Sequence, residues 1–256
     1  MTRDATSNPI EVVRYWTDVT ERKRMEEALL RAERLAAVGQ MATMVAHDFR
    51  NPLTSISGAA YYIRKKLGAS TDKELTEMLE IIEKDVSYAD RILSDLLEYS
   101  GEFEMELVEA HLRSIMEQAL ALVSIPSGTR ARNLMNGQLK ARLDTGKMKR
   151  VFLNLIENGV DVMPQGGELR IQGKESDGAL QVVVSDTGAG MAEDAVKRIW
   201  TPFLTTKAKG VGLRLSISKR IMEAHKDYIS YETEVGKGTA FAVTIPLQAR
   251  NHDSSC

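Results

Sequence analysis

Two stretches in the N-terminal part of the chain carry apolar side chains at helical spacing. Spacings of three, four and seven residues are those of a helix that buries one face. The first stretch has this pattern at Val38, Ala42, Val45, Phe49, Ile56, Ala60, Ile63 and Leu67. The second has it at Leu75, Leu79, Ile82, Val86, Ala89, Leu93 and Leu96. Gly68 ends the first helix and the Thr71–Glu74 pair caps the second, so the sequence predicts an antiparallel helical hairpin.

A hairpin with a wide apolar face on each helix cannot bury both faces alone, which predicts a homodimer built around a four-helix bundle. Upstream, residues 21–40 show a short heptad pattern that favours a coiled coil continuing the first helix, with a single surface helix as the alternative. The pattern residues are Met25, Ala28, Ala32, Leu35 and Gly39. Residues 1–20 form a linker with one short predicted strand from Ile10 to Trp16.

Beyond Gly101 the pattern changes to short apolar strands that alternate with helices. Strands are predicted over residues 138–143, 167–173, 180–185 and 239–246. Helices are predicted over residues 110–123, 147–163, 192–198 and 213–224. Mostly antiparallel strands with helices gathered on one face are typical of an α+β sandwich. We therefore predict a multidomain fold, with the helical hairpin in residues 21–101, the sandwich in residues 102–248 and a polar tail in residues 249–256.

His47 is the candidate reactive residue of the first helix. It lies two residues from both Val45 and Phe49, about 200° around the helix, which turns its imidazole away from the buried seam. Asp48 follows it, and Pro52 cannot donate to the carbonyl of Asp48, so the helix bends or loosens there. This arrangement favours a histidine available for chemistry. A surface histidine on a kinked helix is the alternative.

A polar face on the predicted helix of residues 147–163 carries a second candidate group. Asn154, Asn158 and Asp161 are separated by four and three residues and therefore share one side of the helix. Two amides aimed alike can orient phosphate oxygens and hold an octahedral Mg²⁺, which keeps several of its waters. A solvated helix face is the alternative.

The glycine-rich turn after the strand of residues 180–185 adds a carboxylate. Asp186 ends that strand, and Gly188 and Gly190 follow it. A carboxylate at a strand end can accept a hydrogen bond from an exocyclic amine, and glycines let the backbone approach a ligand closely. Taken alone, this segment is an ordinary β-turn.

Two further glycine-rich turns complete the set. Lys207, Gly210 and Gly212 precede the helix that opens at Leu213, where backbone amides and a lysine make an anion site. The last turn leads through Gly238 to Thr239 and the final strand. The order and spacing of the polar helix face and the three turns together predict a nucleotide site.

Composition excludes several classes of protein. The 256 residues are 43% hydrophobic and 27% charged with a net charge of −2, which indicates a folded protein and gives no basic excess for nucleic acid. No apolar run approaches the roughly 18 residues of a membrane helix, and no signal-peptide core is expected at the N-terminus. The single cysteine, Cys256, cannot form an intrachain disulfide, which fits a reducing, cytoplasmic location.

In this order, the motifs resemble the transmitter region of a sensor histidine kinase over residues 18–248. Residues 47–53 are similar to its H-box, residues 154–161 to its N-box and residues 186–190 to its first glycine box. Pro202 and Phe203 match the F-box, and residues 210–213 match the second glycine box. The short segment of residues 201–207 resembles the subgroup with a short ATP lid. Residues 18–20 resemble the end of a PAS sensor module.

The resemblance implies a role for each matching residue. His47 accepts the γ-phosphoryl group of ATP, Asp48 orients the imidazole and assists proton removal, and Asn51 positions water when phosphate is removed from the partner. Asn158 holds Mg²⁺. The residues implied in ATP binding are Asn154, Asn158, Asp161, Asp186, Gly188, Gly190, Lys207, Gly210, Gly212, Leu213 and Thr239. The partner is the receiver domain of a response regulator, whose aspartate takes the phosphoryl group.

The sequence departs from the family pattern at three places. Arg214 stands where a third glycine closes the second glycine box, and it is expected either to contact phosphate or to crowd the helix start. Gly159 and Val162 replace alanines of the N-box, a difference that concerns side-chain packing. Lys226 and Asp227 replace a pair of glycines after His225, where a left-handed turn is strained for lysine.

Two alternatives follow from these patterns. One is a gyrase- or chaperone-type ATPase clamp, which carries a glutamate base four residues before the metal-binding asparagine. Asn154 occupies that position here, which favours the kinase. The other is a catalytically impaired scaffold or phosphatase-biased regulator, suggested by Arg214.

Overall fold

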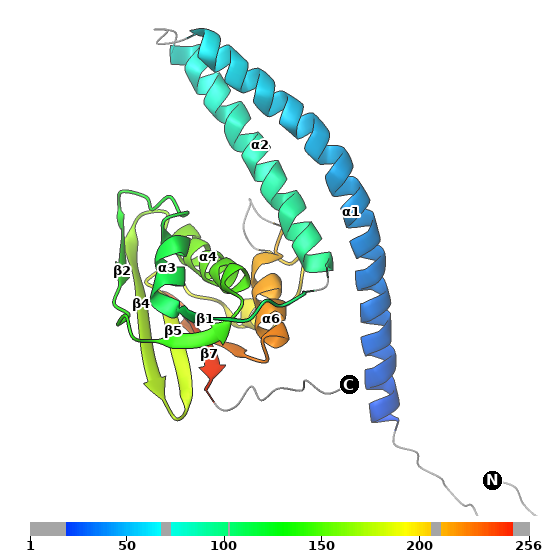
Figure 1. Cartoon of the computed structure of the whole chain (residues 1–256), viewed down its shortest axis with the longest axis vertical. Coiled ribbons are helices and arrows are strands. Elements are labelled where there is room, and N and C mark those ends of the chain that lie inside the picture. Colours follow the sequence, from blue (N-terminus) through cyan, green and yellow to red (C-terminus); the bar gives the residue numbers. More distant parts are fainter. Residues whose placement is uncertain (1–18, 68–72, 102, 206–210, 248–256) are drawn as a thin grey trace, which may run out of the picture.

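The protein consists of a long helical hairpin followed by an α/β unit (Figure 1). The computed structural model describes residues 19–67, 73–101, 103–205 and 211–247, and within the first helix it leaves out the side chains of residues 20, 24–44 and 47. The predicted strand of residues 10–16, residue 18 of the PAS-like end and the polar tail lie outside the described residues. None of the helices in the described ranges is both long enough and apolar enough to cross a membrane.

The hairpin consists of α1 (Thr20–Leu67) and α2 (Lys73–Ser100), as the two apolar stripes predict. Ala46 and Ala60 of α1 are buried. Other members of the same stripe keep 41–58% of their surface exposed, namely Val45, Phe49, Ile56 and Ile63. One partner helix therefore covers only part of the apolar surface of α1.

Pro52 lies inside α1, and the helix curves along its length (Figure 1). Around the proline, the Thr54 hydroxyl donates to the carbonyl of Arg50 at 2.8 Å, and the Ser55 hydroxyl donates to that of Asn51 at 3.2 Å. Hydroxyls that bond to the carbonyl four residues back favour bending of a helix. The expected bend in the segment next to His47 therefore has two local causes, the proline and these hydroxyls.

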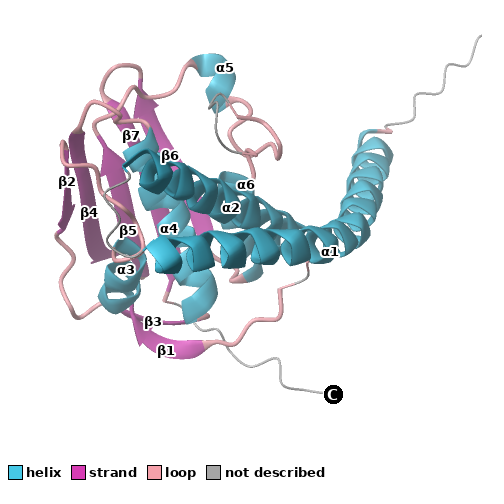
Figure 2. Cartoon of the chain, turned by 90° about the horizontal axis from the view of Figure 1, so that it is seen from above, coloured by secondary structure: helices cyan, strands magenta, loops and turns pink. Residues whose placement is uncertain are grey.

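The α/β unit is built on a five-stranded sheet in the order β2-β4-β5-β7-β6. All neighbouring strands are antiparallel except β2 and β4, and a separate two-stranded sheet pairs β1 with β3. The strands are β1 (Val108–His111), β2 (Thr129–Asn133), β3 (Lys140–Leu143), β4 (Gly167–Ser176), β5 (Ala179–Asp186), β6 (Tyr228–Glu234) and β7 (Gly238–Pro246). The helices are α3 (Leu112–Leu120), α4 (Thr145–Asp161), α5 (Glu193–Val196) and α6 (Arg214–Ala224). Figure 2 shows α3, α4 and α6 on one face of the sheet, as predicted.

The core lies between the sheet and these helices. On β5 the side chains of Leu180, Val182 and Val184 are buried, and Asp186 ends the same inward-facing series. Because side chains alternate between the two faces of a strand, this period places a carboxylate at the end of an apolar row. Facing this row, Phe152 and Leu155 of α4 are buried almost completely.

Three strands were missed by the sequence analysis, which predicted β3, β4, β5 and β7. β1 has only four residues and begins where a helix was predicted from residue 110, and α3 begins at Leu112. β2 is an edge strand with the polar sequence TRARN and no apolar alternation. β6 shows alternating burial, but its inward positions are only partly buried.

The N-terminus of α4 is capped by Asp144, which accepts from the backbone N–H of Lys147 at 2.9 Å. Burial raises the pKa of this carboxylate, but backbone N–H donors from Lys147, Glu106 and Gly146 outweigh that effect and hold the pKa below its usual range. His225 ties the other side of this cap. Its Nε2 accepts from the backbone N–H of Asp144 at 3.0 Å, and its Nδ1 lies 2.8 Å from the carbonyl oxygen of Ile221. His225 is therefore a buried structural residue that joins the end of α6 to the start of α4.

The turn after His225 has the strained conformation expected from its sequence. Lys226 has φ = 60°, in the left-handed region that favours glycine. We expect Lys226→Gly to raise the free energy of unfolding by roughly 0.5–1 kcal/mol, because relief of left-handed strain exceeds the entropy cost of glycine. Chemical denaturation measures the change. Lys226→Ala is the matched control: it keeps the strain, so an equal gain from alanine would contradict the explanation.

Candidate active site

A cavity of about 540 Å³ lies beside α4 and the start of α6. From the α/β unit, its wall contains several residues of the predicted nucleotide site: Asn158, Asp186, Gly190, Gly212, Leu213 and Thr239. These residues come from α4, β5, β7 and two glycine-rich turns, so the fold brings together motifs that are far apart in the sequence. α2 supplies the remaining wall through Tyr88, Arg91, Ile92 and Asp95.

Asp186 is largely buried and organises the two turns next to it. Its Oδ1 accepts from the backbone N–H of Gly188 at 2.9 Å and from that of Thr239 at 3.3 Å. Both donors are residues predicted from the sequence as part of the site. These two bonds orient the Asp186 carboxylate at the end of β5.

Three glycines that line the cavity or lie next to a lining residue cannot be replaced without strain. Gly190, Gly212 and Gly238 have φ values of +67°, +72° and +110°. A Cβ atom would lie 2.2 Å from the carbonyl oxygen of Glu234 at the first, 2.5 Å from that of Leu204 at the second and 2.0 Å from that of Asp186 at the third. The glycines therefore serve both the backbone conformation and close approach between chain segments.

The two amides of α4, predicted on one polar face, have different environments in the structure. Asn154 is fully buried, and its Nδ2 donates to the carbonyl of Arg214 and to the hydroxyl of Ser218, both at 3.1 Å. Asn158 is half-buried at the cavity, and Asp161 is exposed. The difference arises because α6 packs against the side of α4 that carries Asn154. Asn154 thus bridges two helices, and its role in ATP binding stays a prediction.

Arg214 does not crowd the start of α6. It is the first residue of that helix and has ordinary helical geometry, whereas the left-handed position in this turn belongs to Gly212. Its guanidinium lies 3.1 Å from Asp161 Oδ2 and 3.2 Å from Glu157 Oε2. Arg214 also lines the cavity, so these ion pairs lie at its rim, on the same part of α4 as Asn158.

Several residues predicted for the site are not found in the cavity wall, either because they lie elsewhere or because they fall outside the described residues. Asp48 and Asn51 are exposed on α1, and the side chain of His47 on the same helix lies outside the described atoms. Lys207 and Gly210 fall in residues 206–210, which are also outside the description. Gly188 supports the site through its backbone bond to Asp186.

The α2 wall was missed by the sequence analysis, which assigned α2 only to the hairpin. Asp95 is the most informative of these residues because it is a buried carboxylate between the stripe positions Leu93 and Leu96. Burial raises the pKa of Asp95, and the guanidinium groups of Arg150, Arg214 and Arg91 act in the opposite direction. The available signal was the spacing of Arg91, Asp95 and Glu98, which places three charged residues on one side of α2.

Comparison with known families agrees with this organisation. The His Kinase A (phospho-acceptor) domain matches residues 37–101, and the histidine kinase-, DNA gyrase B- and HSP90-like ATPase domain matches residues 143–249. The chain belongs to the sensor histidine kinase family. The phospho-acceptor domain separates this family member from the gyrase and chaperone ATPases, which share only the second domain's fold.

Individual relatives extend the comparison. The chain is 32% identical over 242 residues to sporulation kinase E of Bacillus subtilis, covering 90% of this chain and 31% of that protein. It is 34% identical over 247 residues to the sensor histidine kinase ZraS of Salmonella typhimurium, covering 93% of this chain and 52% of that protein. The chain thus spans about half or less of the length of these relatives.

Two solved structures are also similar to this chain. The histidine kinase ThkA, crystallised in complex with the response regulator protein TrrA, is 29% identical with a TM-score of 0.58, over 91% of this chain and 68% of that one. Full-length ShkA in complex with AMPPNP shares the fold, with 23% identity and a TM-score of 0.67 over 81% of this chain and 46% of that one.

Gly190→Ala should lower the affinity of this family member for ATP by at least about tenfold, because the new Cβ forces the turn away from Glu234. Isothermal titration with a non-hydrolysable ATP analogue measures the effect. Gly236→Ala is the matched control, since Gly236 has φ = +79° but no atom within 4 Å of its Cβ position. Equal losses of affinity in both variants would show that backbone strain, and not the close approach at Gly190, is responsible.

Proposed function

We propose that this chain is an ATP-dependent protein histidine kinase that phosphorylates itself on His47 and passes the phosphoryl group to an aspartate of a response-regulator receiver domain. The observation that carries the proposal is the cavity in which Asn158, Asp186 and the start of α6 meet, in a chain that also contains a phospho-acceptor helix. The cytoplasm, where ATP and receiver domains are available, is the proposed location.

Asp186 is the proposed base-recognition residue. It is held by two backbone donors at the end of β5, where it can accept a hydrogen bond from the exocyclic amine of adenine. At the start of α6, backbone N–H groups and the positive end of the helix dipole favour the phosphates. Arg214 lies at the same end of the cavity, where its guanidinium is paired with Glu157 and Asp161.

Asn158 is the proposed protein ligand of Mg²⁺. Asn158 lies in the wall of the cavity, and its side-chain amide can supply one hard oxygen ligand. The carboxylates of Glu157 and Asp161 on the same helix are paired with Arg214. Such a site fits an ion that is held by one protein group, by waters and by substrate phosphates. When bound, the ion neutralises negative charge on the phosphates.

The proposed chemistry takes place on the imidazole of His47. A ring nitrogen attacks the γ-phosphorus, the bond from that phosphorus to the bridging oxygen breaks, and ADP leaves with the electron pair. The ring loses its proton, and Asp48, the next residue of α1, is the proposed acceptor. In the second transfer the phosphorus–nitrogen bond breaks, and a carboxylate oxygen of the receiver aspartate takes the phosphoryl group. Asn51, on the same exposed segment, is the proposed residue for positioning water during phosphatase activity.

His47→Gln should abolish labelling of the protein by γ-labelled ATP with Mg²⁺ while leaving ATP binding intact, because the substitution lies on α1, whereas the described cavity wall comes from α2 and the α/β unit. In the parent protein the label should be acid-labile and alkali-stable, and addition of a receiver domain should remove it. Label that survives in the variant would overturn the assignment of His47. ATP binding without label in the parent protein would instead support the phosphatase-biased alternative.

A homodimer is the proposed assembly, since one chain leaves apolar positions of the α1 stripe exposed. Ile63→Asp places a charge on that stripe and should shift the protein to a monomer in sedimentation analysis, because burial of an unpaired carboxylate opposes association. Tyr61→Asp is the matched control, since Tyr61 is exposed and lies outside the stripe. A dimer that persists in the Ile63 variant at micromolar concentration would place the interface elsewhere.

A further inference from the structure

Arg214 contacts two carboxylates of α4 at once. Glu157 and Asp161 are four residues apart and therefore lie on one side of that helix. Nη2 of Arg214 lies 3.2 Å from Oε2 of Glu157, and Nη1 lies 3.1 Å from Oδ2 of Asp161. Since each terminal nitrogen serves a different carboxylate, the guanidinium lies between the two acidic groups.

The backbone of Arg214 is fixed by two hydrogen bonds to its carbonyl oxygen. Nδ2 of Asn154 donates to this oxygen at 3.1 Å, and the hydroxyl of Ser218 donates to it at 2.9 Å. The side chains of Arg214 and Glu157 are 27% and 18% exposed, so this pair is shielded from much of the solvent. The ion pairs of Arg214 are therefore part of the packing of α6 against α4, and they hold more firmly than a pair on the open surface.

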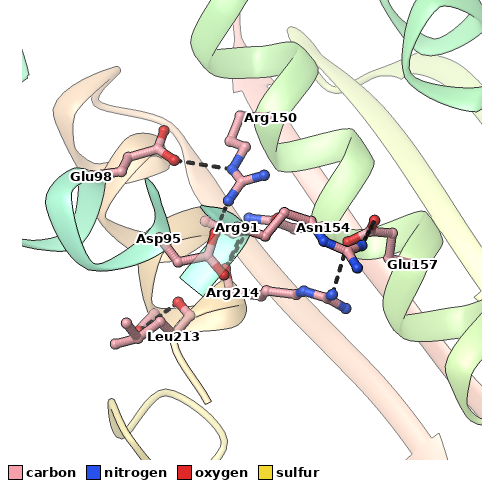
Figure 3. A network of polar contacts seen from close by, with 10 residues as sticks. Arg91, Asp95, Glu98, Arg150, Asn154, Glu157, Leu213 and Arg214 are labelled. Carbon is pink, nitrogen blue, oxygen red and sulfur yellow. Dashed lines mark hydrogen bonds and ion pairs between the residues drawn. The ribbon is translucent and has the colours of Figure 1, made fainter. Parts of the chain in front are cut away.

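Glu157 has a second cationic neighbour. Nη1 of Arg91 on α2 lies 3.8 Å from Oε1 of Glu157, and Figure 3 shows Arg91 and Arg214 both reaching this carboxylate. Together with Asp161, these residues form a cluster of two guanidinium groups and two carboxylates, whose formal charges cancel. Because arginine stays protonated in proteins, a change of pH near neutrality does not remove the positive charges.

The cluster adjoins the part of the cavity where Asn158 is proposed to hold Mg²⁺. Asn158 and Arg214 both line the cavity, and Asn158 directly follows Glu157 on α4. Carboxylate and amide oxygens are the ligands that hard divalent cations prefer, so this side of α4 would attract such an ion if the counterion were removed. With Arg214 in place, the carboxylates are neutralised, and a bare cation meets the positive guanidinium.

A metal ion that arrives on ATP meets a different charge balance. The complex of a divalent cation with the triphosphate is still an anion, so the guanidinium of Arg214 attracts the complex, whereas it repels the cation alone. The phosphates also supply oxygen ligands that the ion would otherwise take from carboxylates. Arg214 thereby distinguishes two species by the sign of their charge.

We propose that Arg214 is a built-in counterion that makes metal binding in this cavity depend on ATP. It neutralises Glu157 and Asp161, which leaves Asn158 as the protein ligand and disfavours a divalent cation that arrives without the nucleotide. Arg214 is thus a specificity-determining residue for the metal–ATP complex. The dependence on ATP rests on the proposed function, but the neutralisation of the two carboxylates does not.

Equilibrium dialysis of the full chain against Mn²⁺, a probe for Mg²⁺, tests this inference without ATP. Arg214→Gln removes the counterion and should raise the affinity of the nucleotide-free protein for Mn²⁺ by roughly tenfold or more, the effect of a unit charge a few ångströms from a divalent ion. Lys219→Gln is the matched control, since it removes the same charge from α6 and breaks an ion pair with Glu223 outside the cavity wall. Adding Glu157→Gln and Asp161→Asn to Arg214→Gln should abolish the gain.

A second dialysis contains a non-hydrolysable ATP analogue at equal concentration on both sides of the membrane. The parent protein and Lys219→Gln should then retain Mn²⁺ well above their nucleotide-free level. In Arg214→Gln, retention of Mn²⁺ should depend less on the analogue, because the nucleotide-free level is already raised.

Thermal melting establishes that each variant is folded. A folded Arg214→Gln variant with the same affinity for Mn²⁺ as Lys219→Gln overturns the counterion, and so does tight binding of Mn²⁺ by the parent protein without nucleotide. A gain that survives loss of both carboxylates overturns their part in the proposal. If the parent protein does not bind the ATP analogue, the dependence on ATP fails with the proposed function, while the nucleotide-free dialysis still decides whether Arg214 neutralises the carboxylates.

Discussion

The packing of α4 is the constraint on which the ATP-binding half of the molecule depends. Phe152, Leu155 and Ile156 are buried against the core, and burial of each such side chain stabilises the fold by about 1.5–3 kcal/mol. This apolar side fixes the rotation of the helix. The remaining sides are thereby assigned, with Asn154 directed to α6 and Asn158 to the cavity.

Because each residue of a helix advances the side chain by about 100°, these assignments are not independent. A rotation of α4 that moved Asn158 out of the cavity would also break the Asn154 bond to the start of α6. It would separate Arg150 from the acidic residues of α2 as well. The cavity, the position of α6 and the docking of the hairpin are thus consequences of one packed helix, which explains how distant motifs can act at one place.

The sequence was sufficient to predict those features whose structure depends on neighbouring residues in the chain. Alternation in β5 predicts both the buried row and the position of Asp186, and the glycines at positions 190, 212 and 238 mark turns that the structure forms with positive φ. It was insufficient to predict features that depend on packing against another element of the fold. β2 has no apolar pattern because it is an edge strand, and Asn154 is buried only because α6 covers it. The same holds for Asp95, whose environment is supplied by arginines of other elements.

The two departures from the family's glycines show why a motif must be interpreted through backbone geometry. At position 214 the chain is helical, so a side chain costs no conformational strain, and the arginine instead forms ion pairs with Glu157 and Asp161. Gly212, two residues earlier, has positive φ and meets the backbone of Leu204, and there the glycine is retained. Lys226 is the opposite case, since it keeps the left-handed conformation without glycine, at the turn where buried His225 ties α6 to Asp144. Replacement of a motif glycine therefore argues against activity only where the backbone or a close neighbour requires glycine, and Arg214 meets neither condition. The objection that Arg214 raised against an intact ATP-binding domain therefore has no basis in backbone geometry.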